Sequence, residues 1–147
     1  MKVTFLGHRN TPERVRKILE TVLKNLIEKE GADDFYVGNQ GNFDSIAWSV
    51  LGGLKREYPN IERTLVLAYM PRGRINGASE EETLFPEAVA AAPPRFAICK
   101  RNDWMIKECD TVITYVTHSR GGAARFKEKA EKLDKRVIEL SAFMKNE

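Results

Sequence analysis

The chain has 147 residues, of which 42% are hydrophobic and 31% charged, a balance that fits one globular domain and excludes a disordered or fibrous protein. Its net charge of +3 is too small an excess to mark a dedicated nucleic-acid-binding protein. No apolar run approaches the roughly 20 residues that span a bilayer, and the first apolar stretch is too short for a signal peptide. Cys99 and Cys109 show no disulfide or metal-ligand spacing. We therefore expect a cytoplasmic protein without membrane contact, metal or other cofactor.

Short apolar runs alternate with helical periods along the chain. The first run stops at Gly7, and Thr11 and Pro12 then form a typical helix start, with Thr11 as the predicted N-cap. Gly31 ends that helix. The same reading of periodicity and turn residues predicts strands at 3–6, 34–37, 64–68, 111–116 and 136–140, and further helices at 42–57, 96–108 and 121–133.

Strands separated by helices favour right-handed crossovers and a parallel sheet covered on both faces. We therefore predict one α/β domain over residues 1–147, a Rossmann-like three-layer sandwich with the strand order 3-2-1-4-5. The segment from about 70 to 95 lacks a clear period and is predicted to be a functional loop or lid. Arg72 and Arg74 in this segment suit phosphates or a polynucleotide backbone.

Three of the predicted strands end in unusual loops, which would meet where the strand order changes direction. Ligands of open α/β sheets bind in that crevice. Glycine admits a ligand close to the backbone, and the helix N-terminus that follows each loop favours an anion. The predicted ligand-binding residues of these loops are Gly7, His8 and Arg9, then Gly38, Asn39, Gln40, Gly41 and Asp44, then His118, Ser119, Gly121, Gly122 and Ala123.

Several common motifs are absent from the sequence. There is no GxGxxG for a dinucleotide and no GxxxxGK[ST] for an NTPase. There is no GxSxG for a hydrolase, and His8 and His118 lack metal-ligand spacing.

Five segments together carry a resemblance to a known family: GHR, YVGNQGNFDSIAW, LAYMP, RNDWMIK and TYVTHSRGGAA. As a set they resemble the SMF/DprA–LOG (SLOG) superfamily, close to a small bacterial group of YpsA-like proteins. The resemblance implies a Rossmann-like fold and a pocket for nucleotides or nucleotide-derived ligands. Because relatives often dimerise, it also leaves homo-oligomerisation open.

Two narrower comparisons suggest alternatives. LONELY GUY phosphoribohydrolases carry an Arg and a Met on one helix and a Pro-Gly-Gly-x-Gly-Thr-x-x-Glu motif, which Arg101, Met105, the Gly121-Gly122 pair and Glu128 match. Four positions depart from that pattern: Asn102, Arg120, Ala124 and Arg125. Separately, Gly41 to Ala47 is similar to the Gly-x-Asp-x-x-Ala segment of the DNA-processing protein A family, which binds single-stranded DNA.

These comparisons leave the question of turnover open. Cleavage of a base–ribose bond needs a carboxylate near the anomeric carbon, for which Glu128, oriented by Arg101, is the candidate, and Arg101 is also a candidate phosphate ligand. Glu128 equally fits a surface pair with Lys132, and Asp44 fits a helix cap. The preferred function is a sensor or sequestering protein for a nucleotide-derived small molecule. The alternatives are a nucleoside-monophosphate phosphoribohydrolase and a single-stranded nucleic-acid-binding protein.

Overall fold

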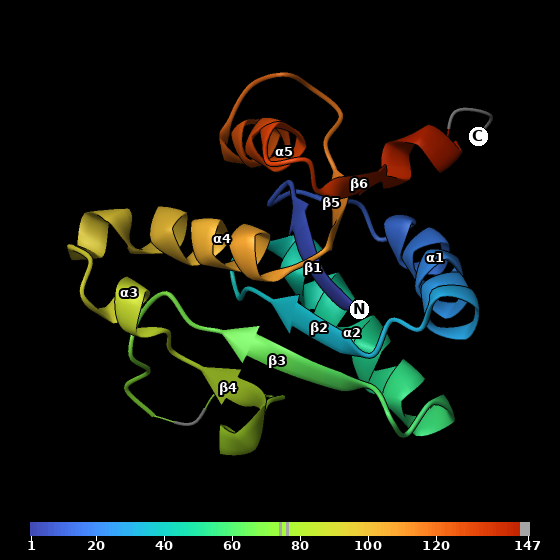
Figure 1. Ribbon diagram of the computed structural model, residues 1–147, viewed down its shortest axis with the longest axis horizontal. Helices are drawn as coiled ribbons and strands as arrows, with labels where there is room; N and C mark the ends of the chain where they lie inside the picture. Colours follow the sequence, from blue (N-terminus) through green and yellow to red (C-terminus); the bar gives the residue numbers. More distant parts are fainter. Residues whose placement is uncertain (74, 76, 145–147) are drawn as a thin grey trace.

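The computed structural model describes residues 1–73, 75 and 77–144 and consists of a parallel six-stranded sheet between two layers of helices (Figure 1). The strands are β1 Lys2–Gly7, β2 Asp34–Val37, β3 Glu62–Val66, β4 Thr83–Leu84, β5 Thr111–Tyr115 and β6 Arg136–Glu139. The α-helices are α1 Val15–Glu30, α2 Asn42–Glu57, α3 Glu87–Ala90, α4 Ala97–Glu108 and α5 Gly122–Lys132, with short 3-10 helices at Glu80–Glu82, Pro94–Phe96 and Leu140–Met144.

The strand order is β4-β3-β2-β1-β5-β6, and every neighbouring pair is parallel. The predicted α/β class and Rossmann-like layering are confirmed. The predicted order differs in one detail, because a sixth strand, β4, lies outside β3, with Thr83 opposite Leu65. This strand is two residues long, too short to produce a period in the sequence.

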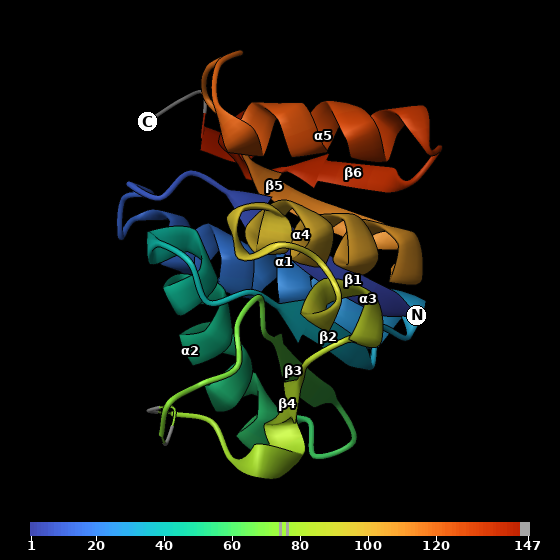
Figure 2. The same cartoon turned by 90° about the vertical axis from the view of Figure 1, so that its left-hand side faces the viewer.

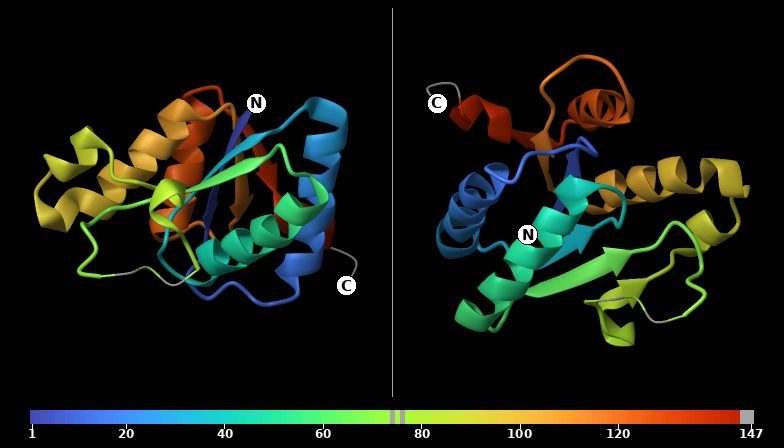
Figure 3. Two further views of the ribbon diagram at one scale, coloured as in Figure 1. Left: turned by 90° about the horizontal axis from the view of Figure 1, so that it is seen from below. Right: turned by 180° about the vertical axis from the view of Figure 1, so that it is seen from behind.

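The two faces of the sheet carry separate cores. Val3 and Phe5 of β1 pack with α1 and α2, whereas Leu6 packs with Met105 of α4 and Phe126 of α5. Side chains of a strand alternate between faces, so β1 supplies both cores, as expected for a strand covered on both sides. Figure 3 (right) shows α1 and α2, in blue and teal, together in front of the sheet.

The start of α1 corrects a prediction. Thr11 is not its N-cap: α1 begins at Val15, after a turn in which Val15 N donates to Pro12 O at 3.1 Å. The Thr11 hydroxyl instead donates to His8 O. This hydrogen bond therefore holds the loop that follows β1. A hydroxyl that bonds a neighbouring backbone group in this way is not available to cap a helix.

The segment predicted as an irregular loop or lid contains short elements: the 3-10 helix Glu80–Glu82, β4, α3 and the 3-10 helix Pro94–Phe96. Figure 2 shows it, in yellow-green, running beside β3. Of its two arginines predicted to suit phosphates, Arg72 is exposed and Arg74 lies outside the described residues. No helix in residues 1–73 and 77–144 has both the length and the apolar character needed to cross a membrane.

Candidate functional site

The loops that follow β1, β2 and β5 meet at one edge of the sheet. β1 lies between β2 and β5, so the carboxyl ends of these three strands are adjacent. His8 N donates to Tyr115 O at 3.3 Å on one side, and Asn42 N donates to Arg9 O at 2.9 Å on the other. The direction of the strand order changes here, which is where ligands of open α/β sheets bind.

The β1 loop and the start of α2 approach each other closely. A Cβ on Gly7 would lie 2.4 Å from Phe43 Cγ, and one on Gly41 would lie 2.8 Å from Arg9 Cα. Gly41 also has a φ of +90°, which strains any other residue. Both glycines are therefore required by packing, whatever they contact in a ligand.

Two helices begin at this edge with the same glycine geometry. Gly41 precedes α2 with φ 90° and ψ 178°, and Gly121 precedes α5 with φ 92° and ψ −179°. This conformation is essentially restricted to glycine. In the part of the chain that the structure describes, neither helix has a side-chain cap, so no side chain there occupies the N–H groups as a cap would. The two N-termini differ in charge: the first turn of α2 carries Asp44, whereas that of α5 carries no acidic residue.

Arg101 and Asp44 both lie close to Gly38. A Cβ on Gly38 would be 2.8 Å from both Arg101 Cζ and Asp44 Oδ2, so a larger residue there would displace one of these two side chains. Asp44 Oδ2 accepts a hydrogen bond from Gln40 N at 2.8 Å. Arg101 is only 1% exposed, and its Nη1 donates to Val66 O at 3.2 Å and to the exposed Asn39 at 3.3 Å.

Burial shifts both charged groups toward their neutral forms. It raises the pKa of Asp44 to about 6, although the hydrogen bond from Gln40 N and the nearby Arg101 oppose this change. Burial also lowers the pKa of Arg101, while Asp44 and Tyr69 raise it. Asp44 is therefore a carboxyl that changes protonation near neutral pH beside a fixed cation, and such groups cluster at functional sites.

His8 and His118 form a stacked pair across the loops after β1 and β5. Their ring centroids are 4.1 Å apart and their planes differ by 9°. His8 Nε2 accepts a hydrogen bond from Thr117 N at 2.9 Å, which requires this nitrogen to be unprotonated. Burial, followed by the neighbouring His118, lowers the pKa of His8, although Glu139 opposes the shift.

This contact predicts a local dependence on pH. His8 should titrate below 6.5, its ordinary value, and protonation of Nε2 should break the bond from Thr117. We expect NMR-detected hydrogen exchange of the Thr117 amide, corrected for its intrinsic rate, to be several-fold faster once His8 is protonated at acidic pH than at neutral pH. Unchanged protection of Thr117 through the His8 titration would contradict this assignment.

Glu128 does not lie beside Arg101. Its side chain is 67% exposed and forms an ion pair with Lys132 at 3.2 Å, the surface pairing that the sequence also allows. It lines a cavity of about 400 Å³ between α5 and the 116–119 loop, which includes His118 and Ser119 but not Arg101. The carboxylate that lies beside Arg101 is Asp44.

The other predicted residues lie along the same edge. Arg9, Ser119, Gly121 and Gly122 are exposed, and Gln40 and Ala123 are half-buried.

The sequence analysis missed Glu139 as a residue that shapes this edge. Its carboxylate accepts hydrogen bonds from the Thr114 hydroxyl at 2.7 Å, from Val116 N at 3.0 Å and from Lys127 Nζ at 3.0 Å. Burial raises its pKa, but these hydrogen bonds and one from Ser141 N outweigh burial and lower it. Glu139 therefore fixes the start of the β5 loop as an anion. Its one sequence signal is a lone carboxylate in the apolar run RVIEL.

Among solved structures, the chain is similar to DNA processing protein A (DprA) from Streptococcus pneumoniae. The match has a TM-score of 0.63 at 17% identity and covers 92% of this chain and 48% of that one. The chain therefore spans about half the length of this neighbour. No protein-family model and no curated protein sequence matches it. At this identity the likeness is one of fold, and it agrees with the Rossmann-like arrangement of the sheet.

Proposed function

We propose that the protein binds a nucleotide or nucleotide-derived small molecule at the carboxyl ends of β1, β2 and β5, as a sensor or sequestering protein. The observation that carries the proposal is the N-terminus of α5. It opens on Gly121 in a conformation reserved for glycine, has no side-chain cap and has no acidic residue in its first turn. Exposed N–H groups at the positive end of a helix dipole are suited to a phosphate.

The rest of the edge supplies complementary groups. Arg9, Arg120 and Arg125 are exposed cations. Arg120 and Arg125, the fourth residue of α5, lie at the start of α5, and Arg9 is on the loop after β1. Asp44, at the start of α2, is the carboxylate suited to accept a hydrogen bond from a sugar hydroxyl. The positively charged guanidinium of Arg101 lies near it. A ligand with a phosphate at one end and a ribose at the other would use both helix starts.

Membership of the SLOG superfamily, and of its YpsA-like group, is part of this proposal. It is supported by the five sequence segments and by the fold likeness to a protein named for DNA processing. That name also motivates the single-stranded nucleic-acid alternative. Binding of this kind would depend steeply on salt concentration, because each neutralised phosphate releases counterions.

Hydrolysis is a narrower alternative. The pairing of Glu128 with Arg101, as in the LONELY GUY motif, is not supported by the exposed position of Glu128. The carboxylate that could serve a hydrolase here is Asp44, because its pKa of about 6 allows it to exchange a proton near neutral pH. Release of free base from a nucleoside monophosphate, lost in Asp44→Asn and kept in Glu128→Gln, would establish this reaction.

The binding proposal predicts opposite effects of one substitution on binding and on stability. Ala123→Asp places a carboxylate in the first turn of α5. Its charge stabilises the helix by about 0.5 kcal/mol through the helix dipole, but the carboxylate occupies the proposed anion site. We expect at least about tenfold weaker binding of nucleoside monophosphates by calorimetry, with no loss of thermal stability. Ala123→Asn is the neutral control. Equal binding by both variants would contradict a phosphate site at α5.

A further inference from the structure

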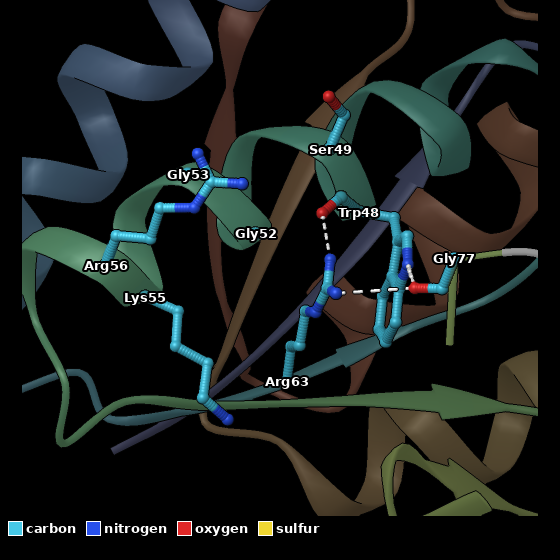
Figure 4. Close-up of a pocket in the computed structure, with 8 residues that line it drawn as sticks. All are labelled: Trp48, Ser49, Gly52, Gly53, Lys55, Arg56, Arg63 and Gly77. Carbon is cyan, nitrogen blue, oxygen red and sulfur yellow. Dashed lines mark hydrogen bonds between the residues drawn. The ribbon is translucent and has the colours of Figure 1, made fainter. Parts of the chain in front are cut away.

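A second cavity lies away from this edge, between the later turns of α2 and the start of β3 (Figure 4). Its volume is about 670 Å³, within the range of small-molecule sites. Among the described residues, its lining contains three cationic side chains and no carboxylate, and it shares no residue with the edge described above. The lining includes Trp48, Gly52, Gly53, Lys55, Arg56 and Arg63.

Arg63 is held rigidly in the wall of this cavity. Its guanidinium lies 3.8 Å from the centre of the Trp48 ring, and its Nη1 donates to Trp48 O at 2.7 Å. Its Nε donates to Glu82 at 2.9 Å, and its Nη2 contacts Gly77 O at 3.4 Å. Among the residues that the structure describes, these contacts use three of the five N–H groups of a guanidinium and leave two for a ligand. The Arg63 side chain is therefore already fixed in place, and a ligand would not have to order it on binding.

Lys55 and Arg56 supply charge that the cavity does not balance. Both are exposed, and neither forms an ion pair within the described part of the chain. Arg63 is paired with Glu82, so the cavity keeps an excess of two positive charges. Figure 4 shows Lys55 and Arg56 extending from α2 in different directions, with the Arg63 guanidinium against the Trp48 ring.

Two consecutive glycines in the C-terminal half of α2 form the floor of the cavity. A Cβ on Gly52 would lie 2.8 Å from Arg63 Nη1, so Gly52 makes room for the guanidinium. A Cβ on Gly53 would meet nothing within 4 Å, so packing gives no reason for glycine there. Glycine weakens a helix interior relative to alanine. The loss of helix stability at Gly53 is explained if a ligand occupies the open space beside this residue.

We propose that this cavity is a second anion site, which binds the phosphate group of a larger molecule as a monoester or a diester. A tetrahedral phosphate offers acceptor oxygens in several directions, which suits a fixed guanidinium and two flexible cations. The remaining volume admits the group that carries the phosphate. The site is independent of the proposed nucleotide site, since it shares no residue with that edge of the sheet.

The test is an NMR titration of the full chain, followed at the Arg63 and Arg56 side-chain Nε signals and the Gly53 amide, with two probes. One probe is inorganic phosphate and the other is a short oligothymidylate, both at low salt. We expect these signals to shift with at least one probe. A shift with phosphate identifies a free or monoester phosphate, and a shift with the oligonucleotide alone identifies a diester. Absence of a shift with either probe overturns the proposal.

Two variants separate the site from general charge and from misfolding. Lys55→Gln with Arg56→Gln should weaken binding of the active probe about tenfold or more. Gly53→Leu should abolish binding by filling the floor, while the helix gains stability. The control, Lys17→Gln with Lys107→Gln, removes two exposed charges elsewhere. An equal loss in that control, or full binding by Gly53→Leu, overturns the proposal. Unchanged nucleotide binding at the carboxyl ends of β1, β2 and β5 in Gly53→Leu distinguishes the two sites.

Discussion

Gly7→Ala is expected to destabilise the protein by about 3 kcal/mol, the upper end of the cost of overpacking a core. The new methyl carbon would lie 2.4 Å from Phe43 Cγ and 2.5 Å from Phe43 Cδ2. Phe43 is only 1% exposed and packs against Phe5, with ring centroids 6.4 Å apart. The ring therefore has no free space to enter, and α2 must shift away from β1. Urea unfolding measures the effect.

The matched control is Gly53→Ala, where the new methyl meets nothing within 4 Å. This variant should be more stable than the parent by up to about 1 kcal/mol, the difference between glycine and alanine inside a helix. Because Phe43 and Asp44 are both in the first turn of α2, Gly7→Ala should also weaken ligand binding at the proposed nucleotide site. A Gly7→Ala protein as stable as the parent would show that the close contact of β1 with α2 does not constrain the fold.

Asp44→Asn should stabilise the protein above pH 6 by about 2 to 3 kcal/mol while weakening ligand binding. The pKa of Asp44 rises from 3.8 to about 6 on folding, mainly through burial. The folded protein therefore binds this proton more tightly than the unfolded chain. The stability that the proton provides is complete below pH 3.8 and is lost as pH rises to about 6. Each unit of pKa corresponds to about 1.4 kcal/mol.

Chemical unfolding of both proteins across this range of pH is the measurement. The parent should lose stability between pH 3.8 and about 6 relative to Asp44→Asn, which has no proton to lose and whose amide oxygen can still accept from Gln40 N. Glu81→Gln, at an exposed carboxylate, is the control. Parallel stability curves for the parent and Asp44→Asn would show that Asp44 does not titrate in this range.

The sheet was predictable because its main strands are apolar or β-branched runs with helical periods between them. The run at 111–116 became β5, whose five residues are all buried. Two features were not predictable by the same reasoning. β4 is too short for a period, and Thr11 donates to His8 O instead of capping α1. The choice between two uses of one hydroxyl depends on where the preceding loop lies in space.

The candidate site was predictable in its glycine loops and less so in its side-chain partners. Arg101 and Gly38 are far apart in sequence, so only the folded sheet brings the Arg101 guanidinium against Gly38 and Asp44. The position of Glu128 has a signal in the periodicity. Phe126 and Ala130 face the core, and a residue two positions from Phe126 is turned by about 200° to the opposite side. Motif spacing favoured Glu128, whereas helical geometry places it toward solvent.

The most direct measurement is an amide NMR titration of the isotope-labelled protein with nucleoside monophosphates. The account predicts shifts concentrated at Gly121 to Ala123, at Gly38 to Gly41 and at the loop after Gly7, with the largest phosphate-dependent shifts at the start of α5. The unphosphorylated nucleosides should cause much smaller shifts there. Absence of shifts with every nucleotide, or shifts confined to surfaces away from this edge, would contradict a nucleotide site at the carboxyl ends of β1, β2 and β5.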